Sequence, residues 1–372
     1  MNFKKIELVH FRNFDSLSVE LNPGINVFAG PNGQGKTNFV ESLYFLSRGT
    51  SFRTSYAAHL VKEDFEIEGA HVFAEFSRGG VDNRVEAHVV EAKKNILLNQ
   101  KKVSPSQLVH HLPCVLFSPE SLLAIKEGPN LRRELLDEMI VTLNPANMKT
   151  ILEFQKALRS RNRILKEAEG RPQDLKVLLP AMDEIYLEKA VELAWTRLEC
   201  IRRINPEVSA IMKVLSGQKA MDTFIDYLVS DESASEWTRE KLVDAARNRM
   251  RELRTAEVAT GMTLVGPHRH DIKIIYGKRD SRFYCSQGQQ RALILSLKMT
   301  QIVHHHRIYG SFPTLFLDDV LSELDGEKRA FLIDFLMGIE TQSILTTTDF
   351  SIFGDVENKL TVFHVNRGTI EV

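Results

Sequence analysis

The sequence predicts an α/β domain that is interrupted by a helical domain, and three observations support this fold class. A Gly-rich turn joins a strand pattern to a helix pattern near the start of the chain. From about residue 118 the apolar residues follow the spacing of helices, and strand patterns return at residue 271. We therefore expect residues 1–125 and 263–372 to form one α/β domain, with a helical domain of residues 126–262 inserted into it.

Length and composition fit this organisation and exclude several classes of protein. The chain has 372 residues, enough for two domains, and its 48 basic and 49 acidic residues give a net charge of −1. A chain that is not basic overall needs a local patch to bind DNA. Cys114, Cys200 and Cys285 form neither a metal-spaced pair nor a disulfide framework. Because we find no apolar run near 18 residues and no signal-peptide pattern, we expect a cytoplasmic protein without a membrane span.

The first 103 residues read mainly as strands. Alternating apolar residues predict one strand at Lys5–Phe11, a second beginning at Ser16 and a third at Ile25–Ala29. A helix is expected to follow at Lys36–Leu46. An antiparallel group comes next, with strands at His71–Ser77, Arg84–Glu91 and Ile96–Leu98 and a turn at Lys93–Asn95.

The middle of the chain reads as helices and the end as alternating strands and helices. Helices are expected at 130–143, 146–169, 174–216 and 235–258. Later strands are expected at Asp271–Tyr276, Thr314–Leu317, Ser343–Leu345 and Leu360–Val365. If the two ends belonged to separate domains, residues 265–372 would have to fold without their first strands.

The Gly-rich turn has the spacing of a phosphate-binding loop. It fits G-x-x-x-x-G-K-[ST] with Gly30, Pro31, Asn32, Gly33, Gln34, Gly35, Lys36 and Thr37. Glycines let backbone N–H groups turn toward phosphate oxygens, and the following helix presents its N-terminus to the same anion. Lys36 would reach the β and γ phosphates, and the Thr37 hydroxyl would coordinate Mg²⁺. The loop therefore predicts ATP or a similar nucleotide as the ligand.

A second part of the site is expected where a buried strand ends in two acids. Residues 314–319 read Thr-Leu-Phe-Leu-Asp-Asp, the pattern of a parallel strand that delivers carboxylates to its C-terminal edge. Asp318 would hold Mg²⁺, and Asp319 would orient or activate the attacking water. Together with Lys36, these two acids are the predicted catalytic residues.

A third motif lies 32 residues before Asp318. Ser286-Gln287-Gly288-Gln289-Gln290-Arg291 opens a helix pattern at Ala292–Ile302, with Ser286 as a natural N-cap. The same helix start would favour an anion. Ser322-Glu323-Leu324-Asp325 follows the paired acids.

The order of these motifs resembles the ABC ATPases. That resemblance implies an ABC-type P-loop ATPase head, with a mixed sheet and an antiparallel β subdomain, and here a helical arm inserted into it. It also implies that Ser286, Gly288 and Gln289 of one subunit complete the ATP site of another in a homodimer. Residues 322–325 would be the D-loop along that interface. The 250 residues from Lys36 to Ser286 exceed the gap in transporter ATPase subunits and fall short of that in SMC proteins.

Short sequence segments spread along nearly the whole chain resemble those of the RecF family. The segments that carry the resemblance are Phe11–Phe14, Gly30–Asn38, Phe117–Glu120, Gly128–Pro129, Arg132–Arg133, Leu136–Asp137, Gly266–Arg269, Ser286–Arg291 and Leu317–Asp325. The resemblance places Arg12, Asn13 and Asn38 beside the nucleotide. It implies ATP and Mg²⁺ as cofactors and an ATP-dependent DNA clamp in repair and replication. It further implies work at gapped or junction DNA with RecO and RecR in loading RecA, and a link to the SOS response.

Three departures from the expected patterns bear on mechanism. Asp319 stands where ABC enzymes usually have Glu, and the shorter carboxylate predicts slow hydrolysis. Thr347-Thr348-Asp349 occupies the place of the transporter switch histidine, which favours the RecF-like branch. The family usually has an acid close after Arg269, whereas here His270 precedes Asp271, so we assign His270 no role.

DNA-contacting residues are predicted in two places. Arg53 resembles an arginine that SMC-type heads use near nucleotide or DNA, although it could also be a solvated surface residue. A basic helix with Lys156, Arg159, Arg161, Arg163 and Lys166 would meet the DNA backbone through phosphate contacts, unless it is a solvated face balanced by Glu167 and Glu169. Adjacent His304, His305 and His306 do not share a helix face, and we expect no metal there. Cys285 is expected to serve packing.

Two other functions stay open at this level, and a third is disfavoured. A transporter ATPase subunit would share the phosphate loop but not the long arm. A nucleotide-gated scaffold would bind partners without hydrolysis, so that Asp319→Asn would change nothing. A metabolic P-loop kinase would have no use for the motifs at Ser286–Gln289 and Ser322–Asp325.

Overall fold

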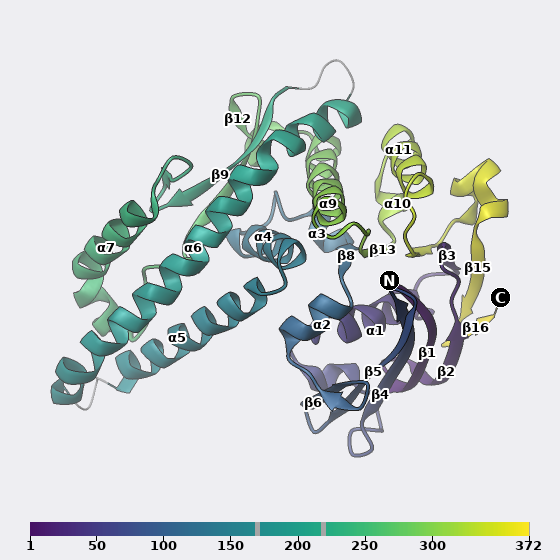
Figure 1. The fold of residues 1–372 in the computed structure, drawn as a ribbon, viewed down its shortest axis with the longest axis horizontal. Helices are drawn as coiled ribbons and strands as arrows, with labels where there is room; N and C mark the ends of the chain where they lie inside the picture. Colours follow the sequence, from purple (N-terminus) through teal and green to yellow (C-terminus); the bar gives the residue numbers. More distant parts are fainter. Residues whose placement is uncertain (168–171, 217–220, 372) are drawn as a thin grey trace. The chain divides into compact units, whose positions relative to one another are not determined.

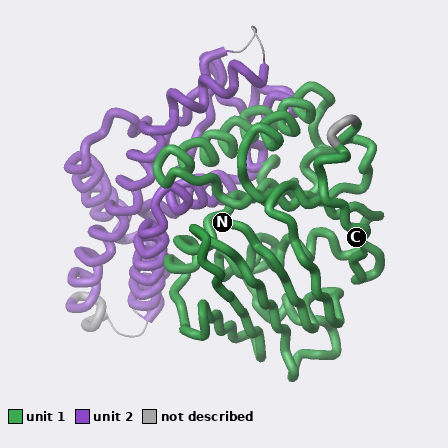
Figure 2. Tube along the Cα trace, turned by 45° about the vertical axis from the view of Figure 1, so that its right-hand side comes forward, with its two compact units in different colours: residues 1–123, 291–372 green, residues 124–290 purple. Residues whose placement is uncertain are grey.

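The computed structural model describes residues 1–167, 172–216 and 221–371 (Figure 1). The chain divides into two compact units, coloured separately in Figure 2. Unit 1 consists of Met1–Leu123 and Arg291–Val372, and unit 2 of Ala124–Gln290. Residues 263–290, which we expected in the α/β domain, therefore lie in unit 2. In the described part of the chain, no helix combines the length and apolar character that a bilayer crossing requires.

Unit 1 contains an antiparallel sheet with the strand order β2-β1-β4-β5-β6-β7. Its strands are β1 (Asn2–Phe11), β2 (Phe14–Glu20), β4 (Ala70–Arg78), β5 (Val81–Val90), β6 (Lys93–Leu98) and β7 (Lys101–Lys102). Along β4 buried residues alternate with half-buried ones, and along much of β5 they alternate with half-buried or exposed ones, so that one face packs on the core and the other is partly open to solvent. The five predicted strands of this sheet are confirmed.

The turn expected at Lys93–Asn95 is wrong. Val90 pairs with Lys93, so β5 and β6 are joined by the two residues Glu91 and Ala92. Both have positive φ, 47° and 62°, which is the geometry of a tight type I′ hairpin turn. Such turns normally contain Asn or Gly, and the Glu-Ala pair gave no sequence signal for them.

The second sheet of unit 1 has the order β16-β15-β3-β14-β13-β8. Its strands are β3 (Ile25–Ala29), β8 (Cys114–Phe117), β13 (Thr314–Asp318), β14 (Ser343–Thr347), β15 (Thr361–Asn366) and β16 (Thr369–Glu371). All pairings are parallel except that of β15 with β16. Strand β8 was not predicted, because a four-residue apolar run has no periodicity that separates a strand from a buried helix turn.

Helix α1 (Lys36–Arg48) contacts strands of both sheets, and the core of unit 1 forms around it. Phe28 of β3 lies against Phe39 of α1, with ring centroids 4.2 Å apart. The remaining helical segments of unit 1 are η1 (Ala57–Leu60), α2 (Pro105–His111), α3 (Pro119–Leu122), α10 (Val320–Glu323), α11 (Gly326–Met337) and η4 (Phe350–Lys359).

Unit 2 is mainly helical but also contains a small sheet. Its helices are α4 (Pro129–Leu143), α5 (Asn147–Glu167), α6 (Pro172–Ser216), α7 (Arg239–Thr260) and α8 (Ser281–Tyr284). The expected helix 146–169 ends in residues outside the described part. The sheet has the order β10-β9-β11-β12, with β9 (Thr223–Val229), β10 (Glu232–Ser233), β11 (Asp271–Tyr276) and β12 (Arg279–Asp280). Pairing with the unpredicted β9 explains why β11 lies in unit 2. Helix α9 (Gln287–Tyr309) begins in unit 2 and continues in unit 1.

Candidate nucleotide site

The phosphate loop connects the end of β3 to the start of α1, as its sequence requires. All three of its glycines have positive φ, and at two of them an added Cβ would also collide with a neighbour. Gly30 has φ +159°, and a Cβ there would collide with the carbonyl oxygen of Val365 on the neighbouring strand. Gly35 has φ +117°, and a Cβ would lie 2.8 Å from the Asn13 side-chain amide. The loop therefore depends on glycine both for its backbone conformation and for its close packing.

Lys36 is held inside this loop by its own backbone. Its ammonium Nζ donates to the carbonyl oxygens of Gly30 at 2.7 Å and Pro31 at 2.8 Å. Burial lowers the pKa of Lys36, while the nearby charges of Asp319 and Asp318 oppose that shift. The ammonium thus sits at the helix N-terminus, where an anion with several oxygens would find a charged donor.

Asp318 lies at the C-terminal end of β13, next to Thr346 of β14. Its Oδ1 accepts hydrogen bonds from Thr37 Oγ1 at 2.9 Å and from Thr346 Oγ1 at 2.8 Å. Burial raises the pKa of Asp318, and the two hydroxyl bonds oppose that rise. The carboxylate is therefore desolvated and fixed against the first turn of α1.

Thr37 and Asp318 fit the requirements of a Mg²⁺ site. Adjacent oxygens on an octahedral Mg²⁺, each about 2.1 Å from the ion, lie about 3.0 Å apart. The observed separation of Thr37 Oγ1 and Asp318 Oδ1 is 2.9 Å. A hydroxyl and one carboxylate are also the usual protein share of a Mg²⁺ site, since phosphates and waters complete the shell.

Asp319 occupies an unusual backbone conformation one residue further on. Its φ is +50°, in the left-handed region that Asp tolerates better than most residues. Its N–H donates to Thr346 Oγ1 at 2.9 Å, and its Oδ1 accepts a bond from Ser322 Oγ at 3.1 Å. Thr346 therefore fixes both acids. Sequence reasoning missed Thr346, although its position at the end of the next parallel strand was a usable signal.

The N-terminal hairpin contributes polar side chains to the same neighbourhood. Asn13 Nδ2 donates to the carbonyl oxygen of Gln34 at 3.1 Å, and its Oδ1 accepts from Asn38 Nδ2 at 2.7 Å. Backbone groups near the C-terminus support the loop from the other side, because Gln34 Oε1 accepts from the N–H of Arg367 at 2.7 Å. The structure thus brings Asn13, Asn38 and the loop together.

A buried acid, Glu41 on α1, organises two arginines beside the loop. Arg12 donates to both Glu41 oxygens, at 2.9 and 2.7 Å, and the Glu41 side chain is fully buried. Arg53 contacts Glu41 at 3.3 Å and donates to Asn38 Oδ1 at 2.7 Å. Arg53 therefore belongs to the surroundings of α1, near the nucleotide loop. Glu41 was missed, although an acid inside the apolar pattern of α1 was its signal.

The predicted signature lies in unit 2, at the start of α9. Ser286 Oγ accepts from the N–H of Gln289 at 3.2 Å, while Gln289 Oε1 accepts from the N–H of Ser286 at 2.8 Å. This reciprocal pair is a capping box and confirms Ser286 as the N-cap. Both bonds lie at the exposed surface. A Cβ added at Gly288 would meet no atom within 4 Å. Phe283 and Tyr284, just before the box, are exposed by 74% and 64%.

One predicted DNA contact is wrong. Arg161 is fully buried in unit 2, where it donates to Asp183 Oδ1 at 2.9 Å and to Glu257 Oε2 at 2.6 Å. It follows Phe154 and Ala157 on the buried stripe of α5 and so faces the core. The other predicted residues remain exposed, namely Lys156, Arg159, Arg163 and Lys166.

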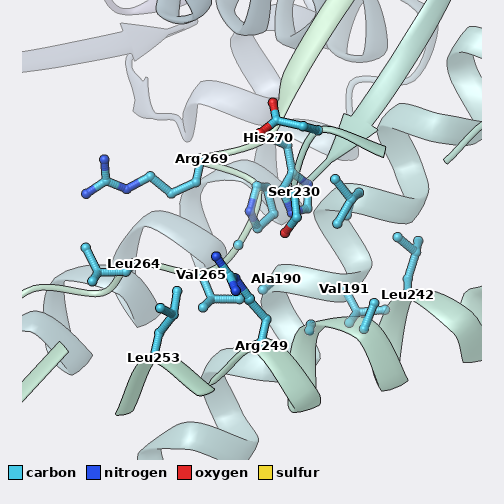
Figure 3. Close-up of a pocket in the computed structure, with 17 residues that line it drawn as sticks. Ala190, Val191, Ser230, Leu242, Arg249, Leu253, Leu264, Val265, Arg269 and His270 are labelled. Carbon is cyan, nitrogen blue, oxygen red and sulfur yellow. The ribbon is translucent and has the colours of Figure 1, made fainter. Parts of the chain in front are cut away.

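The adjacent histidines of α9 pack within unit 1, and His270 lies at a cavity in unit 2. His305 bonds the carbonyl oxygen of Ser311, and His306 stacks on Phe312. His270 is buried beside the Tyr227 hydroxyl at 2.9 Å, and burial lowers its pKa to about 3. It lines a cavity of about 220 Å³ with Arg249 and residues of α6 and α7 (Figure 3). This cavity contains none of the predicted nucleotide-binding residues.

Comparison with known proteins agrees with the motif order. Residues 2–371 match the family model described as the RecF/RecN/SMC N terminal domain. A DNA replication and repair protein RecF from Lysinibacillus sphaericus is 32% identical over 378 residues, covering 100% of both chains. The RecF protein of Heliobacterium modesticaldum is 33% identical over 384 residues, covering 100% of this chain and 99% of that one.

Solved structures give the same result for the fold. A structure of the recombination mediator protein RecF with ATPrS, described as part of the RecFOR pathway, superposes with a TM-score of 0.86 at 30% identity. That match covers 100% of this chain and 97% of the other. The Smc head domain of Pyrococcus furiosus, bound to the C-terminal domain of ScpA, matches in fold with a TM-score of 0.53 at 16% identity and covers 99% and 95%.

Proposed function

The chain belongs to the RecF family within the RecF/RecN/SMC ATPases, and we propose that it acts as an ATP-dependent DNA-binding clamp in DNA replication and recombinational repair. It is an ATPase with the fold of an ABC-type head. One observation carries the proposal: unit 1 holds a complete phosphate loop with its paired acids, and the signature at the start of α9 begins with the exposed Ser286. The site is built in two halves that a second copy could join.

ATP binds with its phosphates at the loop. Lys36 would turn its ammonium from the loop carbonyls to the β and γ phosphates, and the N–H groups at the start of α1 would face the same oxygens. Thr37 and Asp318 would hold Mg²⁺. When bound, Mg²⁺ would neutralise part of the phosphate charge.

Asp319 would orient the attacking water and accept its proton. Its fixed backbone places the carboxylate directly after the metal-binding Asp318, and the hydrogen bond from Ser322 limits its rotation. The carboxylate is one methylene shorter than the Glu usual in ABC enzymes, so we propose slow hydrolysis. A slow reaction suits a clamp that must remain closed on DNA.

A second copy of the chain would complete each site with Ser286, Gly288 and Gln289. The capping box is exposed, and the open space at Gly288 permits close approach of a phosphate. Exposed Phe283 and Tyr284 would provide apolar area next to it. ATP would therefore join two chains, and hydrolysis would release them.

DNA would bind through phosphate contacts from the exposed face of α5. Lys156, Arg159 and Arg163 remain candidates, whereas Arg161 does not. Such contacts are independent of sequence and weaken as salt rises. Replacing all three by Gln should reduce the salt dependence of DNA binding by about three counterion equivalents. If the slope of binding against salt stayed the same, α5 would not be the DNA face.

The finer functional statements rest on the family resemblance. We propose that the protein acts at gapped or junction DNA and works with RecO and RecR to load RecA. A contribution to the SOS response would follow from that role. Two similar RecF structures are described as belonging to the RecFOR pathway, and this description supports RecO and RecR as partners.

The decisive experiment measures DNA binding and oligomeric mass together, with ATP, with ADP and without nucleotide. Wild type should form a DNA-bound dimer with ATP only. Lys36→Met should lose DNA binding and dimer formation because its loop holds phosphate poorly. Ser286→Arg should also lose DNA binding and dimer formation, while the single chain still binds ATP. A protein that stays monomeric and ignores DNA under every condition would contradict the clamp.

Hydrolysis needs a separate test, because a scaffold could dimerise without it. Asp319→Asn should reduce single-turnover hydrolysis by about 100-fold, the order of a lost general base. ATP-dependent dimerisation should persist, and the dimer should last longer. Unchanged hydrolysis in this variant would remove Asp319 from the mechanism.

A further inference from the structure

The outer face of the antiparallel sheet in unit 1 carries three potential metal ligands. His71 of β4 lies directly opposite His88 of β5, and Glu86 precedes His88 by two residues on the same strand. Residues two apart on a strand point to the same face, so all three side chains meet above one place on the sheet. This cluster plays no part in the nucleotide site described above.

The ligand atoms converge on a small volume. Glu86 Oε2 lies 3.6 Å from Nε2 of His71 and 3.6 Å from Nε2 of His88. The candidate ligand atoms of the three residues all lie within 4.8 Å of one another. Ligands about 2.0–2.1 Å from a tetrahedral Zn²⁺ are separated by about 3.3–3.5 Å. The two Glu86 distances are close to this separation, and a rotation of the stacked imidazole rings would point both Nε2 lone pairs at one ion.

Ordinary hydrogen bonds do not join the two imidazoles to the carboxylate. A distance of 3.6 Å is too long for a hydrogen bond between imidazole and carboxylate. In the described part of the chain, the buried Nε2 of His71 has no hydrogen-bond partner at all. The two rings stack with centroids 4.2 Å apart, an arrangement that turns both Nε2 atoms toward the same carboxylate. An unpaired buried nitrogen normally costs stability, which a bound cation would recover.

The sheet holds these ligands rigidly. On its opposite face, Val72, Val85, Ala87 and Val89 are fully buried in the core of unit 1. That burial fixes the register of β4 against β5, because a slip of one residue would expose all of them. The side chains of His71, Glu86 and His88 are 34%, 28% and 45% exposed. A metal ion could therefore reach Glu86 and His88 from solvent, and a turn of the His71 ring would bring its buried Nε2 to the same ion.

We propose that His71, Glu86 and His88 form a binding site for one Zn²⁺ ion, with water in the fourth position. Two imidazoles and one carboxylate are a ligand set that Zn²⁺ uses, whereas Mg²⁺ and Ca²⁺ prefer oxygen ligands alone. The ion would join β4 to β5 and would be independent of the Mg²⁺ expected beside Thr37. The open position would leave room for a ligand from outside the chain.

The test is a titration of Zn²⁺ into the full-length, chelator-treated, nucleotide-free protein in competition with a chromophoric chelator. Wild type should bind one Zn²⁺ tightly. His88→Gln and Glu86→Gln should each lower that affinity at least about tenfold, since each removes a direct ligand. His364→Gln removes an exposed strand histidine elsewhere in unit 1 and should leave the affinity unchanged.

Two further readouts separate a metal site from a change in folding. Co²⁺ should give the visible absorption of a four-coordinate site with wild type and with His364→Gln, and not with His88→Gln. Zn²⁺ should raise the melting temperature of wild type but not of His88→Gln or Glu86→Gln, whose metal-free melting should match wild type. Equal Zn²⁺ affinity in all four proteins would overturn the proposal, as would a wild type that discriminates poorly between Zn²⁺ and Mg²⁺.

Discussion

The two regions assigned to ATP differ in how completely each is built. In unit 1, Lys36, Thr37, Asp318 and Asp319 are buried or half-buried, and each is held by hydrogen bonds from within the unit. In unit 2, the side chains of Ser286 and Gln289 each accept a hydrogen bond from the other residue's backbone N–H, at the surface. The first region is arranged to receive phosphate as a single chain. The second satisfies its own helix end and keeps its outer side free for a partner.

This difference predicts how the two regions divide the work. A change in unit 1 should affect ATP binding by one chain, and through it everything that follows. A change at the capping box should leave that binding intact and affect assembly alone. Four substitutions test this division.

The largest effect is expected from Lys36→Met. Loss of the only ammonium in the loop should weaken ATP binding by the single chain about 100-fold, the worth of two charge-assisted hydrogen bonds. Calorimetric titration of ATP measures it. Lys62→Met removes a half-buried lysine of the same unit, paired with Asp15, and should bind ATP normally. Equal ATP affinity in Lys36→Met and Lys62→Met would contradict the assignment of phosphate binding to the loop in unit 1.

Gly35→Ala should have the next largest effect. The added Cβ would press on Asn13 at a backbone conformation that alanine avoids, so ATP affinity should fall about 10- to 30-fold for a strain of about 1.4–2 kcal/mol. Gly79→Ala is the matched control, because Gly79 also has positive φ, +58°, but open space around its Cβ. Both variants are strained, and only the first should lose affinity for ATP.

Gly288→Ala tests the region in unit 2, where we expect an effect on assembly and none on ATP binding by the single chain. Alanine favours the helix and meets no neighbour, so the melting temperature should stay the same or rise slightly. ATP binding by the single chain should not change. The dimer formed with ATP should weaken about 3- to 10-fold, because the methyl group stands where the partner's phosphate would approach. Sedimentation at several protein concentrations would detect the change, and an unaltered dimer would exclude close contact at Gly288.

Asp318→Asn should give the smallest effect. Unlike the other substitutions, which weaken binding, it should raise the stability of the fold. Since burial raises the pKa of Asp318, its charged form costs stability in the folded protein without Mg²⁺ or nucleotide. The amide should raise the melting temperature by about 2 °C at neutral pH. The gain should be absent below about pH 4, where the carboxyl is protonated even when unfolded, and should grow as pH rises.

A matched acid tests the sign of that effect. The hydrogen bond from Lys328 lowers the pKa of Asp325, so its charged form supports the fold above the unfolded pKa. Asp325→Asn should therefore not raise the melting temperature at neutral pH. If both variants shifted melting in the same direction, burial would not explain the behaviour of Asp318.

The sequence was most informative where a pattern has one physical solution. The glycine spacing placed the loop, and the apolar run with two acids placed β13 beside it. Prediction from the sequence was weaker where the partner of a residue is distant in the chain. Nothing local shows that Arg161 will find Glu257, which lies 96 residues away, so a basic residue was mistaken for a surface one. Strand β9 was missed because its partner β11 follows it by more than 40 residues.

The split of unit 1 into two chain segments has a consequence for biosynthesis. Strand β3 pairs with β14 and β15, which the ribosome makes only after all of unit 2. Unit 2 is one continuous stretch and emerges whole before those strands exist. It is thus expected to fold first, while the apolar β3 waits unpaired. The growing polypeptide would acquire its affinity for nucleotide only after β13 and β14 have emerged, and any chaperone that protects it should act on the segment before unit 2.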